Sequence, residues 1–223
     1  MGAKQDAEAW AETVRRHGER DGLTYEAVGG INPKDAPVAL CVGGVNRLTG
    51  QLAEGFWGSS CDADEKEAGG LFGKAMLPTA ILAKAHMPDL AKVVPAFNVE
   101  SIEGHEALTQ RFARKVEFES IDFNKRFLAT VPREYDPVAL RELFSPGFLG
   151  WVTTMAGRVE FGINDCQLWF LWHLGGRSEE ELKSALKNAG QLFKRLRSEM
   201  EESGLHTYPA GPWHAGLEPF PAA

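Results

Sequence analysis

The sequence lacks any long apolar run and has few cysteines. No stretch approaches the ~20 apolar residues that a helix needs to span a bilayer, and Met1 to Asp6 lack the apolar core of a signal peptide. The cysteines Cys41, Cys61 and Cys166 lie far apart without a Cys-x-x-Cys pair, so neither a disulfide framework nor a zinc site is predicted. We therefore expect a cytoplasmic protein without direct membrane insertion.

Positive charge is also scarce. The formal net charge is -7, and affinity for nucleic acid rests mainly on Lys and Arg side chains that neutralise phosphates, so no nucleic-acid partner is expected. A chain of 223 residues buries roughly 70% of its unfolded surface. Its core therefore needs no disulfide or metal.

Catalytic signatures are missing as well. Gly69 to Lys74 is similar to a phosphate loop, but Ala68 and Ala75 replace the first glycine and the magnesium-binding Ser or Thr. His105 begins like a zinc-protease motif, yet Thr109 stands where the second histidine is required. The sequence predicts no catalytic residue, cofactor or metal ligand.

Local patterns predict helices at both ends and strands between them. Apolar spacing predicts a helix from Ala7 to Arg20. The alternation from Thr24 to Gly58 is typical of strands, and Ser59 to Gly73, with four acidic residues and three glycines, is predicted to be an exposed acidic loop. Further predictions are a strand within Ala75–Met87, a short helix within Gly104–Lys115 and a strand at Phe127–Val131.

Two proline steps mark short helices in the middle of the chain. Asp136-Pro137 and Ser145-Pro146 each combine an N-cap residue with proline at the first helical position. Beyond them, Arg158–Leu174 is predicted to be a hairpin that turns at Asn164-Asp165.

The last predicted helix is long and amphipathic. Ser178 and Glu181 form a capping box, an apolar stripe runs from Leu182 to Met200, and Gly204 ends the helix. These elements predict an α+β fold with a mostly antiparallel sheet. Residues 1–203 are expected to form a single domain, and residues 204–223 an extended tail rich in Pro, Gly and aromatic residues.

The second strand of the hairpin, Leu168-Trp-Phe-Leu-Trp172, has large apolar side chains on both faces. Both faces need cover, because soluble monomers rarely expose apolar patches of several hundred Å². The C-terminal helix can cover one face. The other is expected to meet the helices of Pro137–Thr154, the tail or a second subunit. The interaction residues predicted are Trp169, Leu171, Trp172, Trp213 and Phe220.

Glu119, Asp122 and Asn124 are the candidate polar site. As a functional cluster they could bind a cation or serve as acid and base, since paired carboxylates shift each other's pKa. As structure, Asn124 can satisfy backbone groups beside Phe123 and Phe127. The structural interpretation is favoured.

The order Glu119-x-x-x-Phe123-Asn124, Asp136-Pro137 and Ser145-Pro146-x-Phe148, followed by the aromatic hairpin, resembles an uncharacterised actinobacterial family. In that family a Glu-x-x-x-Phe-Asn segment precedes a short helix and a Leu-x-Pro or Ser-Pro step. The likeness covers roughly Ala75 to Ser203 and includes no catalytic motif. The family looks related to larger membrane-anchored proteins of unknown function, whereas this chain has no membrane segment. The resemblance implies a fold and no activity.

Together these features favour a non-enzymatic accessory or regulatory protein. It is expected to act through a protein partner or as a homo-oligomer, such as a homodimer with exchanged tails. The alternative is an enzyme that binds a small molecule or cation around Glu119, Asp122 and Asn124.

Overall fold

Helices and strands follow one another along the chain in the computed structural model, which describes residues 3–28, 45–63, 80–86, 96–102, 113–133, 137–164 and 167–203. The helices are α1 (Ala3–Arg20), α2 (Ile121–Arg126), α3 (Pro137–Leu143), α4 (Pro146–Thr153) and α5 (Glu179–Glu202). The strands are β1 (Thr24–Val28), β2 (Val45–Ala53), β3 (Phe56–Ala63), β4 (Ala80–His86), β5 (Phe97–Ser101), β6 (Ala113–Val116), β7 (Phe127–Pro132), β8 (Val159–Asn164) and β9 (Gln167–His173).

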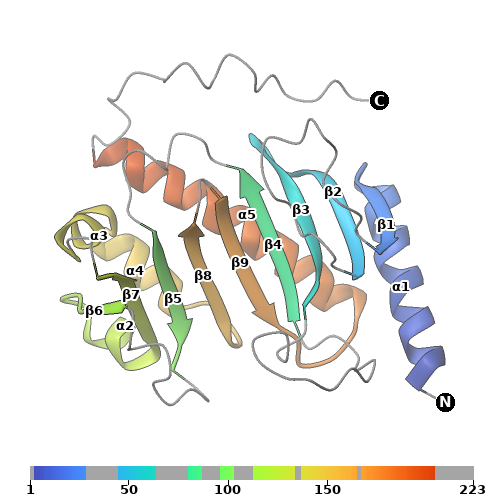
Figure 1. Ribbon diagram of the computed structural model, residues 1–223, viewed down its shortest axis with the longest axis horizontal. Coiled ribbons are helices and arrows are strands. Elements are labelled where there is room, and N and C mark those ends of the chain that lie inside the picture. The colour runs from blue at the N-terminus through green and yellow to red at the C-terminus, as the bar shows by residue number, and fades with distance from the viewer. Residues whose placement is uncertain are drawn as a thin grey trace. The chain divides into compact units, whose positions relative to one another are not determined.

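The strands form one sheet in the order β1-β2-β3-β4-β9-β8-β5-β7-β6 (Figure 1). The pairs β1–β2, β2–β3, β3–β4, β5–β7, β5–β8 and β6–β7 are antiparallel. With an N-terminal helix, two short helices in the middle and a long C-terminal helix, the predicted α+β fold is confirmed. The two strands of the predicted hairpin are also confirmed, since β8 and β9 are neighbours in the sheet, while Asp165 of the predicted turn lies outside the described residues.

The chain divides into two units. Unit 1 comprises Met1–Ala85 and Phe170–Gln191, and unit 2 comprises His86–Trp169 and Leu192–Ala223. The single domain expected for residues 1–203 stays a prediction.

In unit 1, the helices pack on one face of the strands. Gly18 of α1 lies directly against the Leu48 side chain of β2, where a Cβ would collide with it. Farther along the same strand, Ala53 contacts α5 at Gly190. The end of α1 is tied to the start of α5 by an ion pair of 2.7 Å between Arg20 and Glu179. The described helices of this unit therefore leave the opposite face of β2 and β3 without a helix (Figure 1).

In unit 2, phenylalanine rings form the centre of the core. Phe144, at the end of α3, lies 4.7 Å from Phe148, 5.3 Å from Phe97 and 5.5 Å from Phe118, measured between ring centroids. All four rings are buried, and each buried ring removes ~150–250 Å² of surface from water. These contacts join α3 and α4 to strand β5.

The cap of α4 follows the sequence prediction. The Ser145 hydroxyl accepts a hydrogen bond from the Phe148 amide (3.1 Å), and Pro146 is the first helical residue. A second contact was not predicted: the Glu199 carboxylate of α5 accepts from both the amide (2.7 Å) and the hydroxyl (3.0 Å) of Ser145. Glu199 thereby fixes the start of α4 from the C-terminal helix.

The capping box of α5 is present in part. The Ser178 hydroxyl accepts from the Glu181 amide at 3.2 Å. The Glu181 carboxylate does not return to Ser178; it accepts from the amides of Gly175 and Gly176 at 2.8 and 2.9 Å. The carboxylate therefore holds the turn that leads from β9 into the helix.

Two local predictions were wrong. Ser59–Ala63, predicted as the start of an exposed acidic loop, is the second half of β3, because pairing with both β2 and β4 buries Ser59, Ser60 and Cys61. Ala113–Lys115, predicted as the end of a helix, belongs to strand β6 (Ala113–Val116), which pairs with β7 and buries Val116 while Arg114 and Lys115 stay exposed. The rest of both segments, and the tail from residue 204 on, lie outside the described residues.

Candidate functional site

Of the predicted polar site, Asn124 is hydrogen-bonded to the backbone, whereas Glu119 and Asp122 are exposed to solvent. The Asn124 side chain donates to the Phe118 carbonyl (2.6 Å) and accepts from the Phe118 amide (3.1 Å), which closes the loop before α2. Glu119 and Asp122 are not buried. These contacts are compatible with the favoured structural interpretation of Asn124, and the polar site of Glu119, Asp122 and Asn124 stays a prediction.

The predicted interaction residues of β9 point to two faces of the strand. Leu168, Phe170 and Trp172 are 0%, 1% and 8% exposed, whereas Trp169 and Leu171 are half-buried. The indole of Trp169 crosses β8 at Gly162, where a Cβ would lie 2.9 Å from the ring. One face of the strand is thus dry and the other is partly open to solvent. The other two predicted interaction residues, Trp213 and Phe220, lie outside the described residues.

A hydrogen-bonded polar chain in unit 1 was not predicted. The indole N–H of Trp10, on α1, donates to both carboxylate oxygens of Asp62, on β3, at 3.0 and 3.1 Å. The Asn46 amide of β2 donates to the same carboxylate at 2.7 Å, and its oxygen accepts from the Tyr25 hydroxyl of β1 at 2.9 Å. Asn46 adopts a left-handed backbone with φ of 52°, a conformation that asparagine tolerates better than most residues. These hydrogen bonds connect α1 to the three strands β1, β2 and β3.

The Asp62 carboxylate has an unusual protonation equilibrium. Burial raises the pKa of the Asp62 carboxyl from 3.8 to about 6, against the lowering effect of the hydrogen bonds from Asn46 and Trp10 and of the positive charge of Arg177. The Asp62 carboxylate is therefore ionised at neutral pH. The hydrogen bonds from Asn46 and Trp10 and the charge of Arg177 only partly offset the cost of burying its negative charge. A carboxyl group with a perturbed pKa is a candidate functional group.

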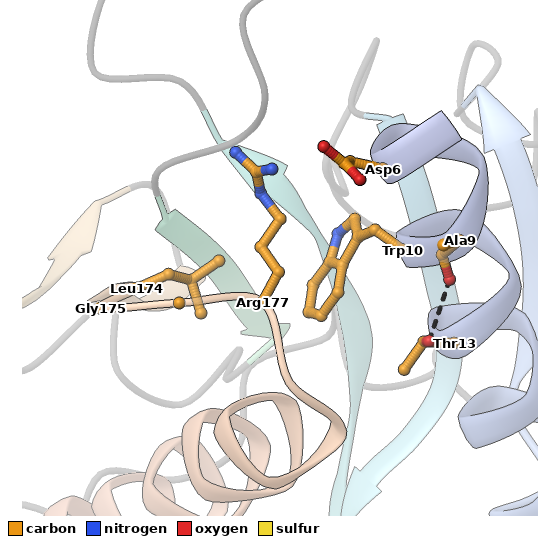
Figure 2. Close-up of a pocket in the computed structure, with 8 residues that line it drawn as sticks. Asp6, Ala9, Trp10, Thr13, Leu174, Gly175 and Arg177 are labelled. Carbon is orange, nitrogen blue, oxygen red and sulfur yellow. Dashed lines mark hydrogen bonds between the residues drawn. The ribbon is translucent and has the colours of Figure 1, made fainter. Parts of the chain in front are cut away.

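The cavity lies next to Trp10 and has a volume of about 540 Å³. Its described lining comes from one face of α1 and from the connection between β9 and α5: Asp6, Ala9, Trp10, Thr13, Leu174, Gly175, Gly176 and Arg177. Figure 2 shows Arg177 rising from the connection, with Trp10 and Asp6 on the α1 side. A volume of this size is in the range of pockets that hold small molecules.

Sequence reasoning missed this site because Asp62 was assigned to the acidic loop. The only signal in its favour is the run of small residues from Gly58 to Cys61, which is compatible with a buried strand that continues to Asp62. The contact between Trp10 and Asp62 spans 52 positions of the sequence, and no local pattern predicts it.

Groups for nucleophilic or metal chemistry do not assemble in the described ranges. Ser59, Ser60 and Cys61 are buried in β3, and no cluster of three His, Cys, Asp or Glu side chains is suited to a metal within these ranges. Cys166 lies outside the described residues. Each helix of the described chain is too short or too polar to cross a bilayer.

Comparisons with known proteins give one finding about the fold. No family model matches the sequence, and no curated protein matches it. The structure is similar to the crystal structure of the mycobacterial trehalose monomycolate transport factor A, TtfA, with a TM-score of 0.57 and 11% sequence identity. The two chains share a fold. The match covers 85% of this chain and 95% of that chain, while membership of the uncharacterised actinobacterial family stays a prediction.

Proposed function

We propose that the chain is a non-enzymatic accessory protein that binds a protein partner through the half-buried face of β9. The observation that carries the proposal is the alternation along this strand, in which Trp169 and Leu171 remain partly open to solvent opposite a dry face. Tryptophan is among the residues that most often anchor protein interfaces.

The neighbouring strands supply two further half-buried apolar side chains. On the face of β3 and β4 away from α1, Trp57 and Leu82 are half-buried, whereas Ser59, Cys61 and Ala80 on the same face are buried. We infer that Leu171 shares this helix-free face with Trp57 and Leu82, because each of the three is a half-buried residue flanked by buried neighbours on its own strand. The partly exposed residues of this face are Trp57, Leu82, Lys84 and Leu171, and buried Ser59 and Cys61 lie between them on β3.

The comparison with TtfA supports an accessory role without identifying the partner. TtfA is described as a transport factor, and the correspondence covers nearly the whole of that chain. One fold can host unrelated functions. The proposed function is therefore tested at the interaction surface and not through the fold. The predicted cytoplasmic location and the homo-oligomer remain part of the proposal.

The experiment compares two variants of the tagged full-length chain. Leu171→Lys places a charge on the proposed surface, and Ile121→Lys places the same charge at a position on α2 that is already 68% exposed. Proteins that co-purify with the unchanged chain are identified by mass spectrometry and then tested again as purified components. Thermal melting shows whether both variants are folded.

The proposal predicts that a purified partner binds the unchanged chain and Ile121→Lys equally and binds Leu171→Lys at least about tenfold more weakly, as expected for loss of an interface anchor. A second copy of the chain as the partner would appear as concentration-dependent mass in light scattering. If folded Leu171→Lys keeps every partner with unchanged affinity, the surface is not the interface and the proposal is wrong.

A further inference from the structure

Lys84 brings a positive charge to the proposed protein-binding surface. It is half-buried on β4, the strand that lies between β3 and β9 in the sheet (Figure 1). Within the described ranges, its ammonium group makes no ion pair and no hydrogen bond. The side chain therefore lacks a counter-charge in the described part of the chain.

Other basic side chains of unit 1 are either paired or fully solvated. Arg20 and Lys183 share the Glu179 carboxylate, at 2.7 and 2.9 Å. Lys187, on α5, is exposed, so water solvates its ammonium group. Lys84 differs from both kinds, because it has no carboxylate partner among the described residues and is partly withdrawn from water.

Apolar residues lie on both sides of Lys84 on this surface. Leu82 precedes it by two residues on β4 and therefore faces the same side. Its register partner on β3 is the buried Ser59, and Trp57 precedes Ser59 by two residues on the same face. Leu171 is on β9, the strand on the other side of β4. The strand that carries Lys84 thus lies between the strands of Trp57 and Leu171.

A partner that contacts both Trp57 and Leu171 passes over β4 and Lys84. Neighbouring strands are ~4.8 Å apart, so such a partner spans about 10 Å from β3 to β9. It removes water from the ammonium group, and this loss of hydration opposes binding unless the partner supplies a negative charge. A carboxylate at this position replaces the lost water with a charge-assisted hydrogen bond.

The charge of the whole chain separates two sources of negative charge. The formal net charge is -7, so an anionic membrane surface repels the molecule as a whole. An acidic side chain of a protein instead brings one negative charge to Lys84, and its neighbours can pack on the apolar residues beside it. One cation among apolar side chains therefore fits a protein segment of mixed composition.

We propose that a separate protein docks on this surface with an Asp or Glu side chain at Lys84 and with apolar side chains on Trp57, Leu82 and Leu171. The proposal rests on the proposed protein-binding function and adds the chemistry of the partner. A basic side chain at the same place would meet a like charge, which weakens binding of the wrong partner. Lys84 is therefore a specificity-determining residue of the surface.

The probe is a library of random peptides displayed on phage, which is selected on the immobilised full-length chain. Peptides that bind are synthesised with a dye, and their affinities for the unchanged protein and for Leu171→Lys are measured by fluorescence anisotropy. Peptides whose binding is weakened by Leu171→Lys occupy the proposed surface. The proposal predicts that these peptides share an Asp or Glu residue among apolar residues.

A double-mutant cycle assigns the acidic residue of the peptide to Lys84. In the unchanged protein, replacing this residue with Asn or Gln should weaken binding by about tenfold, because a charge-assisted hydrogen bond is lost. Lys84→Gln should bind both peptides equally weakly, whereas Lys84→Arg keeps the charge and should still prefer the acidic peptide. Lys187→Gln removes a charge from an exposed position on α5 and should bind both peptides as the unchanged protein does. Thermal melting shows whether each variant is folded.

The outcomes separate this proposal from the proposed function. If the peptides that depend on Leu171 lack acidic residues, or if folded Lys84→Gln keeps the preference for the acidic peptide, the pairing at Lys84 is wrong while the protein-binding surface stands. If no selected peptide depends on Leu171, the surface itself is wrong. Self-association of the full-length chain in light scattering that Lys84→Gln abolishes would identify a second copy as the occupant and would overturn the proposal of a separate partner.

Discussion

Asp62 provides the sharpest test of the buried polar chain, through the dependence of stability on pH. The substitution Asp62→Asn removes the charge and keeps one oxygen that can accept from Trp10 or Asn46. The folded-state pKa of about 6 lies roughly two units above 3.8, and at 1.36 kcal/mol per unit this difference corresponds to ~3 kcal/mol of stability. Because Asp62 is only half-buried, solvent screening makes this an upper value.

The direction follows from proton binding. The folded protein binds a proton more tightly than the unfolded chain does, so the stabilisation from Asp62 is complete below pH 3.8 and is lost as the pH rises through about 6. When the pH is raised from about 4.5 to about 7.5, the loss of this contribution should lower the free energy of unfolding of the unchanged protein by ~2 kcal/mol. The amide that replaces the carboxyl in the variant does not titrate, so the variant lacks this component.

The assay is urea unfolding of both proteins at several pH values, with free energies obtained by linear extrapolation. The free energy of unfolding of Asp62→Asn minus that of the unchanged protein should increase by ~2 kcal/mol from about pH 4.5 to about pH 7.5. Asp122→Asn, at an exposed position on α2, controls for the loss of one carboxylate. A difference that stays constant over this range would refute the account of Asp62.

Three further substitutions test the packing described above. Gly162→Ala would place a Cβ 2.2 Å from the Phe97 carbonyl oxygen, so it should destabilise the fold by ~2 kcal/mol or more in urea unfolding, and a neutral result would contradict the close β5–β8 approach. Ser145→Ala removes the cap of α4 and should lower the free energy of unfolding by ~1 kcal/mol, whereas an unchanged value would show that the hydroxyl contributes nothing. Asn124→Ala leaves the backbone groups of Phe118 unpaired and should cost ~1–3 kcal/mol without changing partner binding; loss of binding in a folded variant would reinstate a functional role for this residue.

The sequence was sufficient to predict elements that depend on local chemistry. Ser145-Pro146 predicted the start of α4 because an N-cap hydroxyl and a proline act within one turn. The turn residues and the large apolar side chains of Leu168–Trp172 predicted strand β9 in the same way, but the strand is apolar on both faces, so its sequence did not indicate which face is dry.

The candidate site could not be predicted in the same way. Asp62 follows residues typical of a strand and precedes an acidic segment. Whether it belongs to the strand or to the loop depends on the pairing of β3 with both β2 and β4, which the sequence does not show. The partner Trp10 is on a helix 52 positions away, and the Asn46 backbone conformation is set by the bulge in β2. Contacts between distant elements bring these groups together, so the polar chain and the cavity become visible only in three dimensions.

Site-specific photo-crosslinking from β9 tests the central claim most directly. A photoreactive phenylalanine analogue replaces Leu171 in the full-length chain inside cells, and the control carries the same group at exposed Ile121. Irradiation should yield a discrete covalent adduct with a protein partner from position 171 and none of the same mass from position 121. Identical adduct patterns from both positions, or no protein adduct from position 171, would contradict the assignment of this face as a protein-binding surface.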